Sequence, residues 1–203
     1  MSVPMALVDY IPVVLFLIAN ISLQRDLYNK MSKGCYAVFC TGGIMIFIAG
    51  AYKATWKLLY ALNVCDFQSL SQCFFPMQAT GFALCAAGII AMLCHKQGET
   101  KTLAVAAPAV FSGTMIFVTM MCLGIIGIGT SLSVLSAKLK KKGLIALFVF
   151  TIIGLLCMGY LSTKDFELPI YNWLAEIINV IAMSCQLIGV RLLHKAGLAD
   201  LEL

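Results

Sequence analysis

The sequence carries very little charge for its length. Of its 203 residues, 11% are charged and 62% are hydrophobic, whereas a soluble domain has about 25% charged and about 45–50% apolar residues. The mean hydropathy of +0.98 points the same way. This composition excludes a soluble globular enzyme, a disordered protein and a fibrous protein. It predicts an all-α polytopic membrane protein, with residues 1–203 forming a single transmembrane domain.

Motifs for catalysis or cofactor binding are also missing. The sequence has no Gly-x-Ser-x-Gly, His-Glu-x-x-His, Walker loop or dinucleotide fingerprint. Its nine cysteines form no Cys-x-x-Cys, and its two histidines, His95 and His194, each precede a lysine at a predicted helix end. We therefore expect no enzyme activity, no metal site and no cofactor. Cys65 and Cys73 flank one predicted loop, where they either pair in an oxidising compartment or stay free thiols.

Long apolar runs, by contrast, are abundant. Six blocks stand out, at about residues 5–24, 34–55, 70–94, 102–137, 143–161 and 168–193. Five have the length of one span, which is ~20 residues. The fourth has no charge before Lys138. Two crossings in that block, at about 102–119 and 123–139 with a turn near Met121–Gly124, give seven transmembrane helices. One long helix over 102–138 gives six.

The positions of the basic residues favour seven helices. With the N-terminus outside, the loops after the first and third predicted helices are cytoplasmic. Two crossings in the fourth block also bring Lys138–Lys142, Arg191 and Lys195 inside, so that eleven of the fourteen basic residues obey the positive-inside rule. We predict an N-out/C-in topology in the plasma membrane, with a retained first helix. Because the charges sit in short loops, no nucleic-acid partner is expected.

Two parts of the sequence resemble each other. Lys33–Phe39 (KGCYAVF) matches Lys142–Phe148 (KGLIALF). The third and the last predicted helices, which come next in each part, both open near a proline and end in His-Lys. The match predicts two parallel three-helix repeat units, residues 5–96 and 123–195, joined by an inverting helix at 102–119. This 3+1+3 arrangement resembles the layout of the SWEET and PQ-loop transporters, which implies a substrate site at the repeat interface near the midplane. The Pro-Gln dipeptide of those transporters is absent from this sequence.

A polar stripe runs along the last predicted helix. Its members, spaced 4, 3, 4 and 3 residues apart and therefore on one face, are Asn172, Glu176, Asn179, Met183 and Gln186. An ionisable group in the bilayer interior costs a few kcal/mol or more, which makes Glu176 a candidate functional residue. Two interpretations stay open. The stripe either bonds neighbouring helices as polar glue or lines a pathway for a solute or proton.

Two lysines lie one turn apart at the outer end of the second predicted helix, beside an aromatic stripe that includes Trp56. Lys53 and Lys57 are either an interfacial anchor with snorkelling side chains or the wall of an outward-facing mouth. A cationic and aromatic wall suits an anionic or aromatic ligand. Because Lys53 and Glu176 both lie in the outer half of the membrane, we expect them to pair.

Asp9 and Gln78 add polar groups near the outer ends of the first and third predicted helices. Together with Glu176 and the two lysines, they predict an outward-opening cavity between the first, second, third and last helices. The favoured hypothesis is a small secondary transporter or facilitator that binds a small solute or ion and contacts the lipid bilayer. The alternative is a non-transporting receptor, or an accessory subunit that binds a membrane partner or a second copy of itself.

Overall fold

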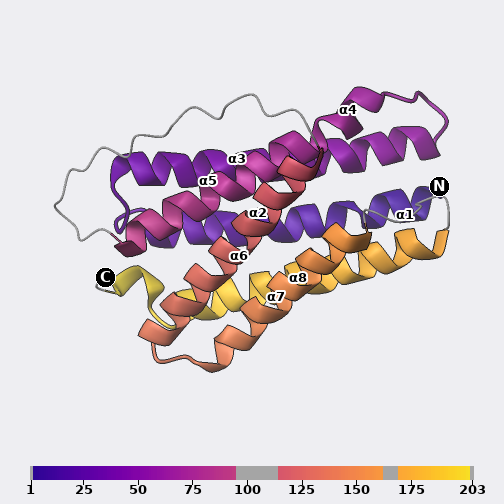
Figure 1. Ribbon diagram of the computed structural model, residues 1–203. Coiled ribbons are helices and arrows are strands. Elements are labelled where there is room, and N and C mark those ends of the chain that lie inside the picture. Colours follow the sequence, from indigo (N-terminus) through magenta and orange to yellow (C-terminus); the bar gives the residue numbers. More distant parts are fainter. Residues whose placement is uncertain (1, 95–113, 162–168, 202–203) are drawn as a thin grey trace.

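The computed structural model describes residues 2–94, 114–161 and 169–201, and within these ranges all regular structure is helical. The elements are α1 (Val3–Val8), α2 (Tyr10–Leu27), α3 (Lys33–Ala61), α4 (Gln68–Gln72), α5 (Phe74–Cys94), α6 (Thr114–Lys138), α7 (Gly143–Leu161), α8 (Pro169–Lys195) and a short 3-10 helix, η1 (Leu198–Asp200), as Figure 1 shows.

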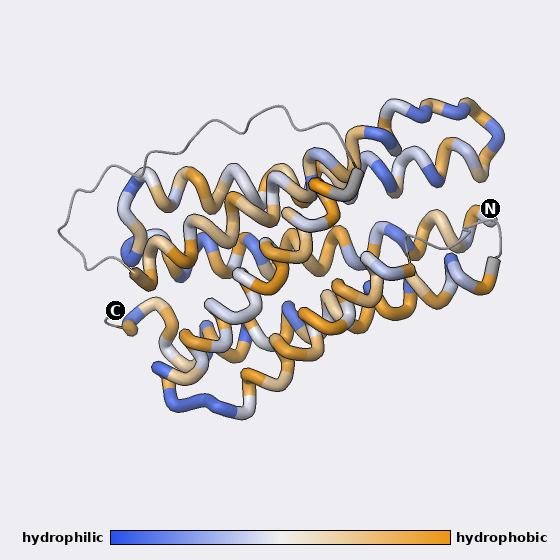
Figure 2. The backbone as a smooth tube through the Cα atoms, in the orientation of Figure 1, coloured by the Kyte–Doolittle hydropathy of each residue, from blue (hydrophilic) through white to orange (hydrophobic). Residues whose placement is uncertain are grey.

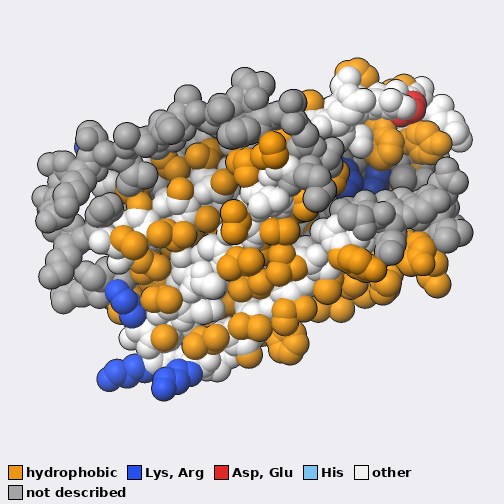
Figure 3. All heavy atoms as spheres, viewed as in Figure 1, with side chains coloured by type: hydrophobic (Ala, Val, Ile, Leu, Met, Phe, Trp, Pro, Cys, Tyr) orange, Lys and Arg blue, Asp and Glu red, His pale blue; other side chains and the backbone are white. Residues whose placement is uncertain are grey.

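Six helical stretches in the described part of the chain are long and apolar enough to cross a membrane. They are Val3–Leu27, Lys33–Ala61, Gln68–Cys94, Ile116–Lys138, Gly143–Leu161 and Ile170–Lys195. Hydrophobic residues occupy their middles, and hydrophilic residues gather in the connections at either end of the bundle (Figure 2). Apolar side chains cover much of the described surface on the face seen in Figure 3. The chain is therefore a multi-pass membrane protein by length and composition.

The predicted turn at Met121–Gly124 is wrong, because α6 runs through it as one continuous helix. Gly124 serves close packing instead. A Cβ at this position would lie 2.6 Å from the carbonyl carbon of Phe82 on α5, so the two helices are in direct backbone contact there. The predicted helices at 102–119 and 123–139 are thus not separated where we expected. Residues 102–113 lie outside the described residues, and the count of seven helices is not confirmed.

Helices α5 and α6 run in the same direction. Gly124 lies against Phe82, and three residues later Gly127 lies against Ala86, so residue numbers rise together along the two helices. In an up-and-down bundle of consecutive spans these neighbours would be antiparallel. The described chain therefore stops at one end of the bundle, where α5 ends, and resumes at the other, where α6 begins (Figure 1).

The remaining neighbours give every helix a direction. Helix α3 is antiparallel to α2, since Gly50 lies against Val13 and Gly43 against Asn20. Helix α3 is also antiparallel to α5, and α7 to α8 (Figure 1). The series α2–α3–α5 and the series α6–α7–α8 therefore follow the same down–up–down course.

One end of the bundle collects most of the described basic residues. We call the end where α2, α5, α6 and α8 finish the basic end, and the opposite one the N-terminal end. The basic residues at the basic end are Arg25, Lys30, Lys33, Lys138, Lys140, Lys141, Lys142, Arg191 and Lys195. Polar contacts also close this end. The buried carboxylate of Asp26 lies 2.9 Å from Nδ1 of His194, and the ammonium of Lys30 donates to the carbonyl of Leu201.

Asp9 lies inside the bundle, at a one-residue interruption of the first span. Pro12 has no N–H to donate to the carbonyl of Val8, and its ring crowds that carbonyl. Helix α1 ends at Val8 and α2 begins at Tyr10. Asp9 stands between them, with its side chain only 10% exposed.

Candidate functional site

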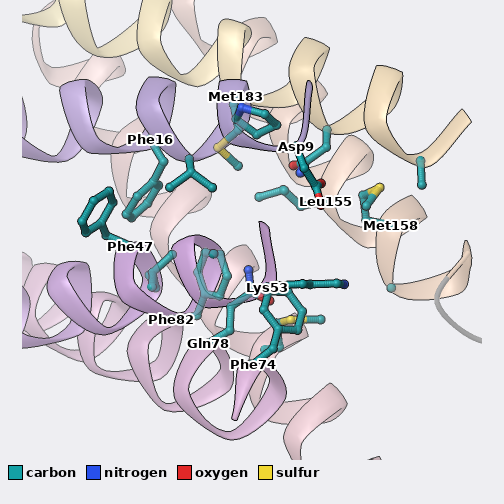
Figure 4. A pocket seen from close by; sticks show the side chains of 18 of the residues that line it. Asp9, Phe16, Phe47, Lys53, Phe74, Gln78, Phe82, Leu155, Met158 and Met183 are labelled. Atoms are coloured by element: carbon teal, nitrogen blue, oxygen red, sulfur yellow. The ribbon is translucent and has the colours of Figure 1, made fainter. Parts of the chain in front are cut away.

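A cavity of about 130 Å³ lies inside the half of the bundle nearer the N-terminal end, and α2, α3, α5, α6, α7 and α8 all contribute to its wall (Figure 4). A single buried water needs only about 10–15 Å³. The cavity therefore has room for a small organic solute. We expected a cavity between the first, second, third and last predicted helices, and the structure adds α6 and α7 to its lining.

Four ionisable side chains line the cavity: Asp9, Lys53, Lys57 and Glu176. They come from the α1/α2 junction, from α3 and from α8, so segments far apart in the sequence meet here. In Figure 4, Asp9 and Lys53 lie on opposite sides of the space. Charged groups at this depth in an apolar bundle are expensive unless they are paired.

Lys57 is the centre of a buried ion cluster. Its Nζ lies 2.5 Å from Oδ2 of Asp9 and 2.7 Å from Oε1 of Glu176. The lysine residue is 6% exposed and the glutamate 3%. Lys57 is therefore not a snorkelling anchor, because its ammonium points into the bundle. The pairing that we expected between Lys53 and Glu176 is wrong, since Glu176 pairs with the lysine one turn further along α3.

Lys53 faces the same cavity with a different set of neighbours. Its Nζ lies 4.0 Å from the ring centroid of Phe74 and 6.0 Å from that of Phe75. These are cation–π distances. Among the described residues, no carboxylate lies within ion-pair distance of this ammonium. Lys53 thus offers the cavity a positive charge that makes no direct ion pair with the cluster.

Two carboxylate oxygens in the cluster are left without a hydrogen bond. Oε2 of Glu176 and Oδ2 of Asp9 are both buried and accept none, although Oδ2 lies 2.5 Å from Nζ of Lys57. With both acids ionised, two carboxylates share one ammonium, so the cluster carries one negative charge in excess. A buried, unsatisfied acceptor normally costs about 1–3 kcal/mol, so both oxygens would be stabilised by a proton or by another hydrogen-bond donor.

Beyond the charged groups, the wall is apolar. The aromatic and aliphatic side chains that line it are Phe16, Ile46, Phe47, Phe82, Met121, Ile125, Leu155, Met158 and Met183. Figure 4 shows Phe16, Phe47 and Phe82 on one side of the space and Leu155 and Met158 on another. The site therefore combines a charged region with an apolar one, as small-molecule sites usually do.

The structure brings together most, but not all, of the predicted site residues. Those that line the cavity are Asp9, Lys53, Lys57, Gln78, Glu176 and Asn179. Asn172 is buried on the same helix face but does not line it. Gln186 lines a separate space of about 20 Å³. Trp56 lies outside, where its Nε1 donates to Oδ1 of Asp66 at 2.9 Å.

The apolar lining was missed because phenylalanine and methionine give no contrast in a sequence this hydrophobic. Their positions around the cavity follow from tertiary packing.

Cys65 and Cys73 are both exposed and free. Within the described residues, no group of three or more histidine, cysteine or acidic side chains is placed to hold a metal ion.

Comparison with known proteins finds no relative of this chain. No protein-family model, no curated protein and no solved structure matches it. Its function must therefore be argued from the cavity, from the charges that line it and from the directions of the helices.

Proposed function

We propose that the protein is a secondary transporter or facilitator of a small solute in the plasma membrane. The solute binds in the central cavity, and the cluster of Asp9, Lys57 and Glu176 couples its movement to a proton or another ion. The observation that carries this proposal is a buried ion cluster facing a solute-sized cavity between apolar helices. Intramembrane ionisable residues around a cavity are typical of ion and substrate pathways.

A purely structural role explains less of the geometry. Polar glue between helices needs paired groups and no open space. Here the pairing is incomplete, because Oε2 of Glu176 has no donor, and the charges border a cavity. A buried ion pair is also weak support for stability, since desolvation of the charges offsets much of their attraction.

The helix directions support two parallel units. The series α2–α3–α5 and α6–α7–α8 run down–up–down, and residues of both line the cavity. We propose that the units are structural repeats spanning about 3–94 and 114–195, with the site between them, as in transporters built from parallel repeats. With the basic end in the cytoplasm, as the positive-inside rule predicts, the N-terminus lies outside.

The excess charge of the cluster supplies a coupling mechanism. When Asp9 and Glu176 are both ionised, they hold Lys57 between the first span and α8. A proton taken up by either acid removes the excess charge and weakens one of the two ion pairs. The relative stability of the outward-open and inward-open arrangements then depends on protonation, which is the differential interaction that coupling requires.

Uptake into proteoliposomes tests this proposal. Purified protein is reconstituted, and accumulation of labelled small solutes is measured with and without an imposed proton gradient. We expect gradient-driven uptake, and we expect Glu176→Gln to abolish the gradient dependence. Asp66→Asn, which changes an exposed carboxylate outside the cavity, should transport like the unmodified protein.

Two results would speak against the proposal in different ways. Uptake that is unaffected by Glu176→Gln would exclude Glu176 as the coupling group. Absence of uptake for every solute, with a membrane protein that co-purifies in fixed ratio, would favour the accessory-subunit alternative.

A further inference from the structure

The cavity contains two charge centres of opposite sign that sit side by side. The cluster of Asp9, Lys57 and Glu176 is negative by one charge when its acids are ionised, and Lys53 is a separate ammonium. Lys53 and Lys57 are one helical turn apart, and residues at this spacing have Cβ atoms about 5–6 Å apart. A ligand bridging the two centres therefore needs a negative and a positive group only a few bonds apart.

The two centres also lack partners in complementary ways. Asp9 and Glu176 both line the cavity, and each has a buried carboxylate oxygen that no described group satisfies. The negative centre therefore has acceptors left for a ligand ammonium. Lys53 rests on the face of Phe74 rather than on a carboxylate, so its ammonium can donate to a ligand carboxylate.

The apolar part of the cavity accepts the rest of such a ligand. Phe16, Phe47, Phe82 and Met183 line the space beside the charged groups. Apolar cavities of about 150 Å³ admit benzene, and this one, at about 130 Å³, is slightly smaller. A branched aliphatic side chain matches that space, and a phenyl ring is its upper limit.

Charge balance separates the ligand classes. The four ionisable side chains sum to zero when all are ionised, so a zwitterion leaves the site neutral and contacts both centres. A monoanion would contact Lys53 and leave the excess charge of the cluster uncompensated. A monocation would satisfy Glu176 and leave Lys53 without a carboxylate. Each single-charge ligand therefore forgoes one charge-assisted hydrogen bond.

We propose that the cavity binds a zwitterionic solute of the neutral amino-acid class with an apolar side chain, whose carboxylate lies at Lys53 and whose ammonium lies at the carboxylates of Asp9 and Glu176. This assignment rests on the proposed function and names the substrate class for the same site. Asn179 and Gln78, which line the cavity beside these groups, supply amide donors and acceptors for the remaining polar atoms of the ligand.

Equilibrium binding to the full chain in lipid nanodiscs tests the charge assignment. The probe is tritiated L-phenylalanine, with L-leucine as a second probe. Unlabelled 3-phenylpropionate, which lacks the ammonium, and phenethylamine, which lacks the carboxylate, are the competitors. We expect each competitor to bind roughly tenfold or more weakly than L-phenylalanine, because each has lost a charge-assisted hydrogen bond.

Two variants separate a binding role from a structural one. In Lys53→Met, L-phenylalanine and phenethylamine should compete about equally, since the carboxylate has lost its partner. In Glu176→Gln, the affinities of L-phenylalanine and 3-phenylpropionate should become similar, since the ammonium has lost a partner. A variant that merely misfolds would weaken all ligands together. Lys53→Met, at the residue outside the ion cluster, keeps the test valid if Glu176→Gln is unstable.

The outcomes distinguish this inference from the proposed function. Binding of zwitterions without any uptake into proteoliposomes would support the inference and refute transport. Uptake of singly charged solutes, with zwitterions excluded, would support transport and overturn the inference. Equal competition by L-phenylalanine and both analogues, or no binding of either probe at millimolar concentration, would overturn it as well.

Discussion

Replacing Lys57 by methionine should destabilise the protein more than any other single neutralisation in the cavity. Its Nζ is the only ammonium within ion-pair distance of Asp9 and Glu176 among the described residues, at 2.5 Å and 2.7 Å. Methionine keeps much of the side-chain length and removes the charge. Two buried carboxylates, 10% and 4% exposed, would then face each other without a cation.

The expected magnitude follows from that geometry. Removing one partner of a buried ion pair costs about 3–5 kcal/mol, because the remaining charge is left uncompensated. Glu176→Gln should cost less, about 1–3 kcal/mol, since Lys57 keeps Asp9 as its partner. The double variant should cost less than the sum of the two single variants, because neutralising Glu176 relieves part of what the loss of Lys57 leaves behind. We expect a coupling energy of about 1–3 kcal/mol.

The free energy of unfolding can be measured by titrating the protein in mixed micelles with SDS and following helical circular dichroism. Lys142→Met is the matched control, since it makes the same chemical change at an exposed residue of the basic end and should stay within about 0.5 kcal/mol of the unmodified protein. The reasoning is refuted if Lys57→Met is as mild as this control, or if the effects of the Lys57 and Glu176 changes simply add.

Two further predictions concern the packing of α6 and the basic end. Gly124→Ala should lower the free energy of unfolding by about 1–3 kcal/mol, because the new Cβ would meet the backbone of Phe82 at 2.6 Å. Gly143→Ala, where a Cβ meets nothing within 4 Å, is the control, and equal effects in the same SDS titration would contradict the close contact of α5 and α6. Asp26→Asn should cost about 1–3 kcal/mol through the contact with His194 at 2.9 Å, and a melting temperature unchanged in detergent would show that this contact does not hold the basic end closed.

Periodicity predicted the orientation of α8 well. The 4-3-4-3 spacing put Asn172, Glu176, Asn179 and Gln186 on one face, and the structure buries that face or turns it into the cavity. Exposed isoleucines such as Ile177 cover the opposite face. The sequence of a helix exposed to lipid on one side separates polar from apolar residues onto opposite faces. Its inward face can therefore be recognised without knowing its neighbours.

The partner of Glu176 could not be predicted in the same way. Lys53 and Lys57 share a face of α3, and the sequence does not say which of them lies level with Glu176. That depends on how far α3 and α8 are shifted along each other. Asp9 keeps helical dihedrals at the junction of α1 and α2 and joins them from the first span, on the same face as Phe16.

The block around Gly124 was misinterpreted for a related reason. A glycine in an apolar run is compatible with a turn and with close helix packing, and only the neighbour decides between them. Here the neighbour is the backbone of Phe82. The parallel course of α5 and α6 likewise appears only in three dimensions, although the basic residues Lys138 to Lys142 had already placed the end of α6 on the side of the other positive charges.

The central claim is that the cavity opens alternately to the two sides of the membrane, and the accessibility of an introduced cysteine tests it without knowledge of the substrate. In a background with all nine cysteines replaced, Asn179→Cys puts a thiol on the cavity wall. The control Ile177→Cys puts one on the outer surface of the same helix, where the native residue is 53% exposed. A charged, membrane-impermeant thiol reagent is then applied to right-side-out and to inside-out vesicles. We expect the thiol at 179 to be labelled from both sides and the thiol at 177 from neither. Labelling of residue 179 from one side only, at every pH and with every solute tried, would contradict it.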